Sequence, residues 1–379
     1  MPNDPPLPRA DTPLTLLGGL TPSRFLQRHW QRKPLLVRAA LPGCEPLLTR
    51  AQLFALARRA DVESRVVVQN AGGRWTLEHG PFKKSALPAP SQAGWTLLVQ
   101  GVDLHDDAAH ALLQSFRFVP GARVDDVMIS WASDGGGVGP HVDSYDVFLL
   151  QVAGKRRWRI GRERGPRYVP EAPLKILERF APTEEHVLEP GDMLYLPPQW
   201  AHEGVAEGGE CMTYSIGFRA PRRRELAAAL MERLAGDSTD ETIYGDARLE
   251  ATLRPARVPA RLQRFAAATV RRLLDDRHAI DGALGEVLSE PKPGVAFDEP
   301  DEKWTTGAVR LDRRTRMLYD ERNVYINGDS CRATGADARL LRRLADERRL
   351  DARTVRGASA AARALLGEWF AAGWLRSGG

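Results

Sequence analysis

Cysteine is scarce in this chain: only Cys44, Cys211 and Cys331 occur among 379 residues. They lie far apart and form no Cys-x-x-Cys pair, which argues against a disulfide framework or a structural zinc cluster. We therefore expect a reducing, cytoplasmic environment. No apolar run reaches the roughly eighteen residues that a membrane span requires, so we expect no contact with a membrane. The proline-rich first ten residues lack the apolar stretch of a secretory signal.

Charge is distributed unevenly along a chain long enough for two or three domains. The net charge is +5, and residues 301–379 carry sixteen Lys or Arg against eleven Asp or Glu. A basic segment of this kind can meet nucleic acid. An Arg-rich surface facing water explains it equally well, so nucleic-acid contact stays open and is not predicted.

Two histidines and an aspartate form the most informative pattern. His141 and Asp143 are separated by one residue, so an extended strand would place both side chains on the same face. His202 follows much later, after a Pro-Pro-Gln-Trp-Ala segment. Two histidines and one carboxylate can hold a divalent metal on one side and leave the other side open, which suits non-haem Fe(II) and oxygen chemistry. We predict His141, Asp143 and His202 as metal ligands and catalytic residues.

A buried arginine is predicted near these ligands. We expect strands at 147–150 and 156–160, with Ala153–Gly154 as the turn between them. Arg156 shares a face with two large apolar side chains and should point inward. A buried guanidinium needs an anion, and its planar fork suits a carboxylate. A dicarboxylate cosubstrate would meet this need, although pairing with an acid of the core is the alternative.

Small residues around the predicted ligands leave room for a substrate. The segment 133–140 contains four glycines in five positions but no following Gly-Lys-Ser/Thr, so we interpret it as a flexible lip rather than a phosphate cradle. Asp134 on this lip is predicted to receive a cationic substrate side chain. Tyr145 and Thr213 are predicted to support the metal and the cosubstrate. Many short strands with Gly/Pro turns predict a small β-barrel or double-sheet jelly roll.

These motifs together resemble the JmjC-type cupin oxygenases, most closely the ribosomal oxygenases and the bacterial arginine 3-hydroxylases of a large-subunit ribosomal protein. The motifs that carry the resemblance are His141-x-Asp143, Asp146-Val-Phe148-x-x-Gln151, Gly154-x-Arg156-x-Trp158, Pro190-Gly191-Asp192-x-Leu194-Tyr195-x-Pro197-Pro198 and His202. One departure is Gln199, where relatives usually carry glycine. Because glutamine tolerates most turn conformations other than those with positive φ, we expect the site to be retained.

The resemblance implies an α+β protein in which a double-stranded β-helix (jelly-roll cupin/JmjC) barrel is followed by two smaller domains. It implies an oxygenase domain with N-terminal helices at 1–220, a helical dimerisation domain at 221–295 and a winged-helix-like domain at 300–379. Apolar residues at helical spacing in 224–235 and 261–276 indicate only that one face of each helix is buried. A homodimer is implied by the resemblance alone.

The activity implied by the resemblance is that of a 2-oxoglutarate-dependent dioxygenase. It would use Fe(II), 2-oxoglutarate and O2, with the distal carboxylate of 2-oxoglutarate at Arg156, to hydroxylate an arginine of a ribosomal protein. A histidine target is the first alternative, since human relatives hydroxylate histidine. The residue pattern is also compatible with a metal-dependent cupin isomerase, a cofactor-independent dioxygenase, or a cupin binding module without oxygenase activity.

Overall fold

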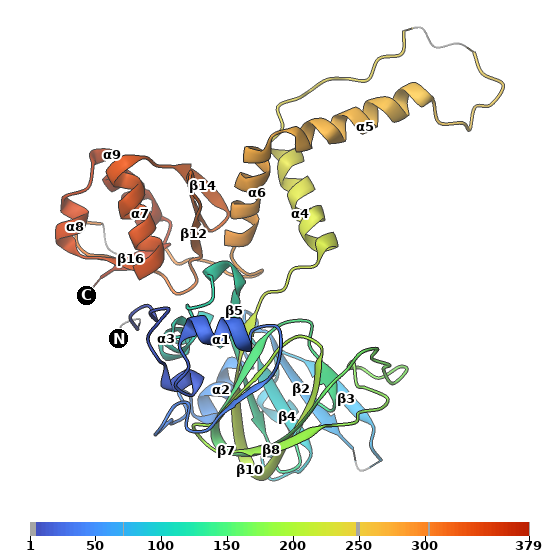
Figure 1. The fold of residues 1–379 in the computed structure, drawn as a ribbon, viewed down its shortest axis with the longest axis vertical. Coiled ribbons are helices and arrows are strands. Elements are labelled where there is room, and N and C mark those ends of the chain that lie inside the picture. The colour runs from blue at the N-terminus through green and yellow to red at the C-terminus, as the bar shows by residue number, and fades with distance from the viewer. Residues whose placement is uncertain (1–4, 71, 248–250, 302–303, 379) are drawn as a thin grey trace. The chain divides into compact units, whose positions relative to one another are not determined.

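The computed structural model describes residues 5–70, 72–247, 251–301 and 304–378. The chain divides into two compact units, Met1–Ala220 and Pro221–Gly379, and each is described by itself (Figure 1). The sequence also predicts a hairpin over 65–77, and Ala71 in its turn lies outside the described residues. The predicted division into three domains, with a boundary near 295–300, stays a prediction. No helix in the described ranges is long and apolar enough to cross a membrane.

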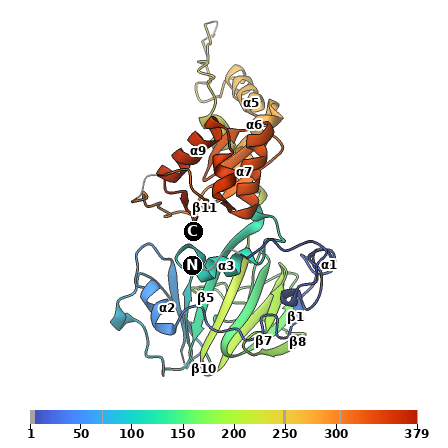
Figure 2. The ribbon, with the colours of Figure 1, turned by 90° about the vertical axis from the view of Figure 1, so that its left-hand side faces the viewer.

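The N-terminal unit is built on one antiparallel sheet that curves into a barrel (Figure 2). Its strands are β1 (Leu35–Val37), β2 (Ser64–Gln69), β3 (Trp75–His79), β4 (Trp95–Val99), β5 (Val124–Ala132), β6 (His141–Val142), β7 (Val147–Arg162), β8 (Glu184–Leu188), β9 (Met193–Leu196) and β10 (Trp200–Phe218). The main path runs β1-β9-β7-β10-β5-β4-β2-β3, while β6 pairs with β10 and β8 pairs with β7. The helices of this unit are α1 (Pro22–Arg28), α2 (Arg50–Leu56) and α3 (Asp107–Gln114).

Two long strands differ from the prediction. β7 is continuous over 147–162, so the predicted turn at Ala153–Gly154 is wrong. Gly154 instead adopts φ = 63° within the strand, close to the backbone of β10. The sequence predicts a strand over 211–218 after His202, but β10 already begins at Trp200, so His202 and this segment belong to one continuous strand. Register shifts between Glu207 and Thr213 let the strand bend there instead of ending.

Caps and aromatic packing attach the N-terminal helices to the barrel. Thr21 caps α1 by accepting from the backbone N–H of Arg24, as the Thr-Pro sequence predicts. The ring of Phe25 in α1 lies 5.0 Å from Tyr195 and 5.4 Å from Phe148 between centroids. All three side chains are fully buried. The segment around α1 is therefore part of the barrel core.

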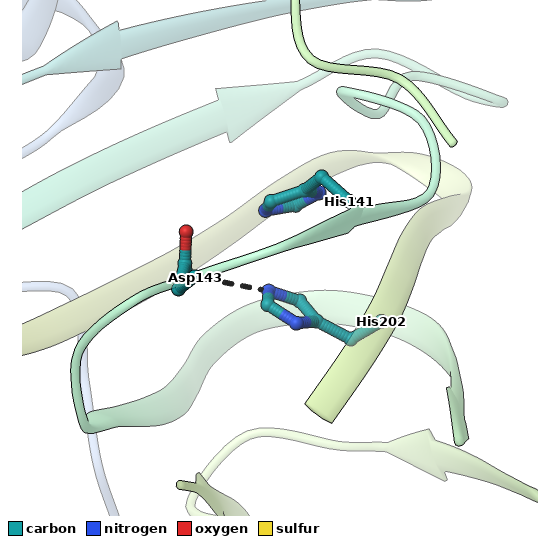
Figure 3. Close-up of side chains that lie close together, drawn as sticks. All are labelled: His141, Asp143 and His202. Carbon is teal, nitrogen blue, oxygen red and sulfur yellow. Dashed lines mark ion pairs between the residues drawn. The ribbon is translucent and has the colours of Figure 1, made fainter. Parts of the chain in front are cut away.

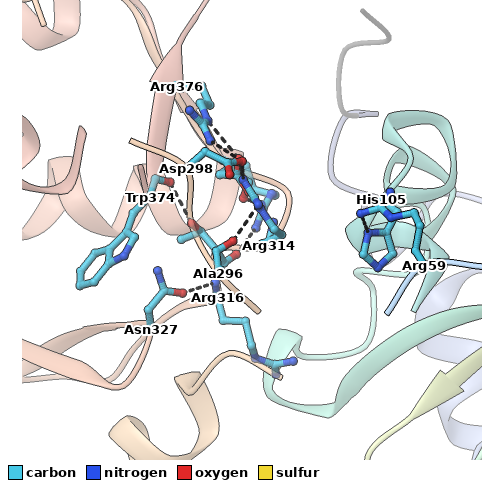
Figure 4. A network of polar contacts seen from close by, with 12 residues as sticks. Arg59, His105, Ala296, Asp298, Arg314, Arg316, Asn327, Trp374 and Arg376 are labelled. Atoms are coloured by element: carbon cyan, nitrogen blue, oxygen red, sulfur yellow. Dashed lines mark hydrogen bonds and ion pairs between the residues drawn. The ribbon is translucent and has the colours of Figure 1, made fainter. Parts of the chain in front are cut away.

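The C-terminal unit consists of three helices followed by two small sheets with further helices. Its elements are α4 (Arg223–Gly236), α5 (Ala260–Asp275), α6 (Arg277–Ser289), β11 (Val309–Leu311), β12 (Met317–Tyr319), β13 (Asn323–Ile326), β14 (Asp329–Arg332), α7 (Gly335–Glu347), β15 (Arg349–Leu350), α8 (Ala352–Arg356), α9 (Ala360–Ala371) and β16 (Leu375–Ser377). The sheets have the orders β15-β11-β16 and β12-β13-β14. Arg314 and Arg376 both form ion pairs with Asp298 (Figure 4).

Several apolar side chains of α5 are exposed. Leu262, Val270 and Leu274 in α5 are 37, 45 and 46% exposed, and none of the residues of α5 is buried. Of the residues predicted to face inward, Phe265 and Leu273 are half-buried and Leu262 is exposed, so the predicted face is only partly buried in the single chain. In α4, by contrast, Leu234 is buried.

Candidate metal centre

The side chains of His141, Asp143 and His202 lie close together, two from one segment and the third from a distant strand (Figure 3). His141 lies in β6, Asp143 follows that strand directly, and His202 lies opposite His141 in β10. Each offers one ligand atom, and these atoms lie within 4.8 Å of one another. Nε2 of His202 is 3.6 Å from Oδ2 of Asp143, and the two imidazole centroids are 4.2 Å apart. This spacing suits a single divalent ion held from one side.

Backbone carbonyls determine which ring nitrogen carries the proton in His141 and in His202. Nδ1 of His141 lies 2.9 Å from the carbonyl oxygen of Gly139, and Nδ1 of His202 lies 3.0 Å from that of Trp200. A carbonyl only accepts, so Nδ1 carries the proton in each ring and Nε2 keeps a free lone pair. Burial, together with the neighbouring His141 ring, lowers the pKa of His202 to about 4, although Asp143 acts in the opposite direction. At neutral pH His202 is therefore uncharged and able to bind a metal.

Gln199 adopts a conformation that glutamine disfavours. Its φ is 68°, in the left-handed region where glycine has no penalty. The expectation that Gln199 adopts an ordinary turn conformation is therefore wrong. The N–H of Gln199 donates to the backbone carbonyl of Asp143 at 3.2 Å, so the strained residue still holds the ligand loop.

Arg156 is buried, and only one of its three guanidinium nitrogens has a hydrogen-bond partner among the described residues. The residue is 5% exposed, and its Nη1 donates to Oγ of Ser130 at a long 3.4 Å. Nε and Nη2 find no hydrogen-bond partner among the described residues, and neither does Nε1 of the adjacent Trp158. The predicted pairing of Arg156 with an acid of the core is not seen in the described ranges. A buried guanidinium in this state requires an anion from outside the chain.

One cavity of about 360 Å³ contains the three candidate ligands and Arg156. Tyr145 lies on its wall, where burial and the nearby Asp143 and Asp126 raise the pKa of its hydroxyl. The segment at 174–176 also lines the cavity. Its size suits a small dicarboxylate together with part of a second molecule. The donor set and the lone guanidinium therefore fit a divalent metal and a carboxylate ligand in the same space.

Comparisons with known proteins agree over nearly the whole chain. The JmjC domain family matches residues 111–226, and the ROXA-like winged helix family matches residues 272–376. The sequence is 34% identical over 318 residues to the ribosomal protein uL16 3-hydroxylase of Escherichia coli K12, covering 80% of this chain and 84% of that protein. The chain belongs to the JmjC ribosomal oxygenases.

Solved structures of a ribosomal oxygenase share the fold. The crystal structure of E. coli YcfD superimposes with a TM-score of 0.81 at 29% identity, covering 94% of this chain and 98% of YcfD. A second structure, of YcfD with cobalt and 2-oxoglutarate, gives a TM-score of 0.78 over the same shares. The predicted cupin barrel and the winged-helix fold are thereby confirmed.

Two predicted residues of this ribosomal oxygenase lie elsewhere than expected. The hydroxyl of Thr213 donates to Oε1 of Gln151 at 2.8 Å, and Thr213 is not among the described residues that line the cavity. Asp134 also lies outside that lining, and its Oδ1 accepts from the backbone N–H of Gly208. Both roles stay predictions without support from this geometry.

Several residues of the cavity wall belong to no short motif, and sequence reasoning missed them. Alternation along β5 places Asp126, Met128 and Ser130 on the face that lines the cavity. That alternation is readable in the sequence, but it does not say which face turns inward. Lys175 also lines the cavity, from an irregular segment whose path no local pattern predicts.

Proposed function

We propose that this chain is an Fe(II)- and 2-oxoglutarate-dependent dioxygenase that hydroxylates an arginine of the large-subunit ribosomal protein uL16. The observation that carries the proposal is the buried guanidinium of Arg156, two of whose nitrogens lack a partner within the described residues. It shares a cavity with a two-histidine, one-carboxylate cluster. The names of the relatives support the cosubstrate and the target protein.

The proposed roles follow from the positions of the side chains. His141, Asp143 and His202 would hold Fe(II), and Arg156 with Ser130 would bind the distal carboxylate of 2-oxoglutarate. The bound metal supplies the activation of O2. The chain itself would orient the cosubstrate and leave Nε2 of both histidines free to bind the metal.

Two carboxylates of the cavity wall would attract a cationic target side chain, while Arg65 and Lys175 on the same wall oppose it. Asp125 and Asp126 line the cavity together with the hydroxyl-bearing Tyr145. Asp126 is 2% exposed and is held by Nε2 of Gln100 and the N–H of Gly101, at 2.7 and 2.9 Å. Fixed carboxylates in a partly dry cavity favour a guanidinium over a neutral side chain. The carboxylates are compatible with an arginine target, and the choice of arginine rests on the family resemblance.

The proposal is tested by incubating the protein with Fe(II), ascorbate, 2-oxoglutarate and a uL16 peptide. We expect release of succinate and a one-oxygen mass gain on an arginine, located by tandem mass spectrometry. A mass gain on histidine would instead support the histidyl hydroxylase alternative. Absence of both succinate and a mass gain would leave a cupin binding module.

A pair of arginines on one strand gives a matched control for the cosubstrate site. Arg156→Leu should raise the KM for 2-oxoglutarate by about 10-fold or more, because charge-assisted hydrogen bonds are lost. Arg157→Leu changes the next residue, which pairs with Glu185 and Glu207 on the other face of β7. The KM of Arg157→Leu for 2-oxoglutarate should stay within about twofold of that of the parent, as expected when an exposed ion pair is lost. Equal effects of the two changes would contradict the assignment of Arg156.

We further propose a homodimer formed through α5. The exposed stripe of Leu262, Val270 and Leu274 is apolar surface that a monomer would leave in water. Replacing Val270 and Leu274 by Glu should give a monomer in size-exclusion chromatography with light scattering. Arg264→Glu, which lies away from the stripe on the same helix, should leave the dimer intact. A parent protein that is monomeric at micromolar concentration would refute the proposal.

We also infer that the protein works in the cytoplasm. Its three cysteines are all free thiols, as a reducing compartment allows, and ribosomal proteins are found there. Fractionation of cells that produce the protein would test this inference.

A further inference from the structure

The loop that carries the candidate ligand Asp143 has no regular structure of its own. It spans Asp143 to Asp146, between the end of β6 and the start of β7. The same loop carries Tyr145, which lines the metal cavity. Hydrogen bonds within a strand do not hold these four residues, so other contacts must set the position of the Asp143 carboxylate.

The buried carboxylate of Asp146 contacts side chains from distant parts of the N-terminal unit. Asp146 is 0% exposed. Oη of Tyr195 donates to its Oδ1 at 2.7 Å, and Nε2 of Gln31 donates to its Oδ2 at 3.1 Å. Nη2 of Arg123 forms an ion pair with Oδ2 at 3.5 Å. Three segments remote in sequence thus meet one carboxylate, which offsets the cost of burying its charge.

The partners of Asp146 are themselves fixed. Oη of Tyr195 also accepts from the backbone N–H of Gln31 at 2.8 Å, which closes a ring of three groups. The backbone carbonyl of Asp146 accepts from the N–H of Phe218 at 3.1 Å. At the other end of the loop, the carbonyl of Asp143 accepts from the N–H of Gln199. The four-residue loop is therefore held at both ends.

We propose that Asp146 is a positioning residue for the metal centre: its carboxylate fixes the Asp143–Asp146 loop and thereby the reach of Asp143 and Tyr145 into the cavity. This inference rests on the proposed function, since it assumes a metal at His141, Asp143 and His202. Asp146 contacts neither metal nor substrate. It acts by restricting the loop, as outer residues around metal ligands commonly do.

A second aspartate in the same unit provides a matched control. Asp192 is 7% exposed and accepts from Nη1 of Arg38 at 2.6 Å and from the backbone N–H groups of Ala39 and Glu189 at 3.0 and 3.1 Å. Like Asp146 it joins an arginine and distant backbone to a turn of the barrel. It is not among the described residues that line the cavity. A change at Asp192 therefore costs stability without moving the ligand loop.

The test measures Co(II) binding by absorbance in the visible region, without any turnover, beside the thermal midpoint of each variant. Asp146→Asn should raise the Kd for Co(II) about 10-fold or more and change the band shape, as is typical when an outer partner of a ligand is lost. Asp192→Asn should lower the thermal midpoint and leave the Kd and the band shape unchanged. Tyr195→Phe removes one hydroxyl only, and should raise the Kd by a smaller factor.

The outcomes separate this inference from the proposed function. If the parent binds one Co(II) and His141→Ala abolishes binding, but Asp146→Asn and Tyr195→Phe leave the Kd unchanged, Asp146 is only structural and the inference is overturned. If the parent itself binds no Co(II), the proposed metal centre is refuted, whatever the role of Asp146. Should Asp146→Asn not fold, Tyr195→Phe decides the question, because a Kd equal to that of the parent would overturn the inference.

Discussion

Gly139 is the residue whose backbone bears most directly on a candidate ligand. Its carbonyl accepts from Nδ1 of His141, and its φ is 75°. A Cβ atom there would lie 2.8 Å from Cδ1 of Ile176 and 2.9 Å from Cζ2 of Trp75. Only glycine both adopts this positive φ without strain and leaves room for Ile176 and Trp75. The orientation of one ligand thus depends on the absence of a side chain two residues earlier.

Gly139→Ala should therefore damage both stability and metal binding. We expect a loss of about 1–3 kcal/mol in the free energy of unfolding, from left-handed strain and overpacking. The Kd for Co(II) should rise about 10-fold, because the hydrogen bond that orients His141 is displaced. Chemical denaturation and Co(II) titration measure the two effects.

The control is Gly135→Ala in the same loop. Gly135 has a similar φ of 69°, but a Cβ there would meet no atom within 4 Å. It should show a conformational cost of about 1–2 kcal/mol and unchanged Co(II) binding. Weaker Co(II) binding in both variants to the same degree would mean that general loosening of the loop, not the position of Gly139, is responsible.

At the scale of the element, the carboxylate of Asp312, directly after β11, bonds Arg376 of β16 and Arg314 of the turn that follows β11. It accepts from Nε and the backbone N–H of Arg314 at 2.8 and 2.9 Å, and from Nε of Arg376 at 3.1 Å. Burial alone would raise the pKa of this carboxyl. The hydrogen bonds from Arg314, its charge and the contact with Arg376 outweigh burial and lower the pKa to about 2.

This lowered pKa predicts acid sensitivity in the C-terminal unit. The unfolded carboxyl titrates near pH 4, so the stabilisation is complete above about pH 4 and is lost as the pH falls toward 2. A difference of about 2 between the unfolded and folded pKa values corresponds to at most about 2.7 kcal/mol. Asp312→Asn should therefore be less stable than the parent at pH 7, and the difference should shrink between pH 4 and 2. Urea unfolding at each pH measures it.

Asp329→Asn serves as the comparison for this prediction. Asp329 lies exposed in β14 of the same unit, and it forms no ion pair within the described ranges. Its replacement should change stability by no more than about 0.5 kcal/mol at any of these pH values. If the Asp312→Asn difference stayed constant from pH 7 to pH 2, the carboxyl would not be the cause.

At the scale of the whole molecule, each unit has its own hydrophobic core. One core contains Phe25, Phe148 and Tyr195 of the barrel, and the other contains Leu341, Leu366 and Trp369 of the C-terminal unit. The candidate ligands, Arg156 and the contacts of Asp146 all lie before Pro221. The metal centre is thus contained in one unit.

We expect the two units to unfold in separate transitions. Calorimetry of the full chain should resolve two peaks, because each unit has its own hydrophobic core. Co(II) should raise the midpoint of only one of them, since a ligand stabilises the unit that binds it. A single transition that Co(II) shifts as a whole would show that the units are energetically coupled.

The sequence by itself determined the types of residue that the chemistry needs and many of the local elements. The His141-x-Asp143 spacing, the inward face of Arg156 and the Thr21 cap depend on neighbours in the chain, and such patterns are local. The family's motifs are also local, and they carried the prediction of the barrel. These features could be read because each is set within a few residues.

Only the tertiary structure decided how distant segments meet. It placed His202 inside a strand opposite His141, made β7 continuous through Gly154, and left the guanidinium of Arg156 without a carboxylate among the described residues. In the folded chain Thr213 bonds Gln151 and does not line the cavity. The side chains of Gln31, Arg123 and Tyr195 all contact the carboxylate of Asp146. The physical reason is that a buried polar group selects its partner by position in space. A linear pattern shows that a partner is needed, but it does not show which of many distant side chains the fold will bring there.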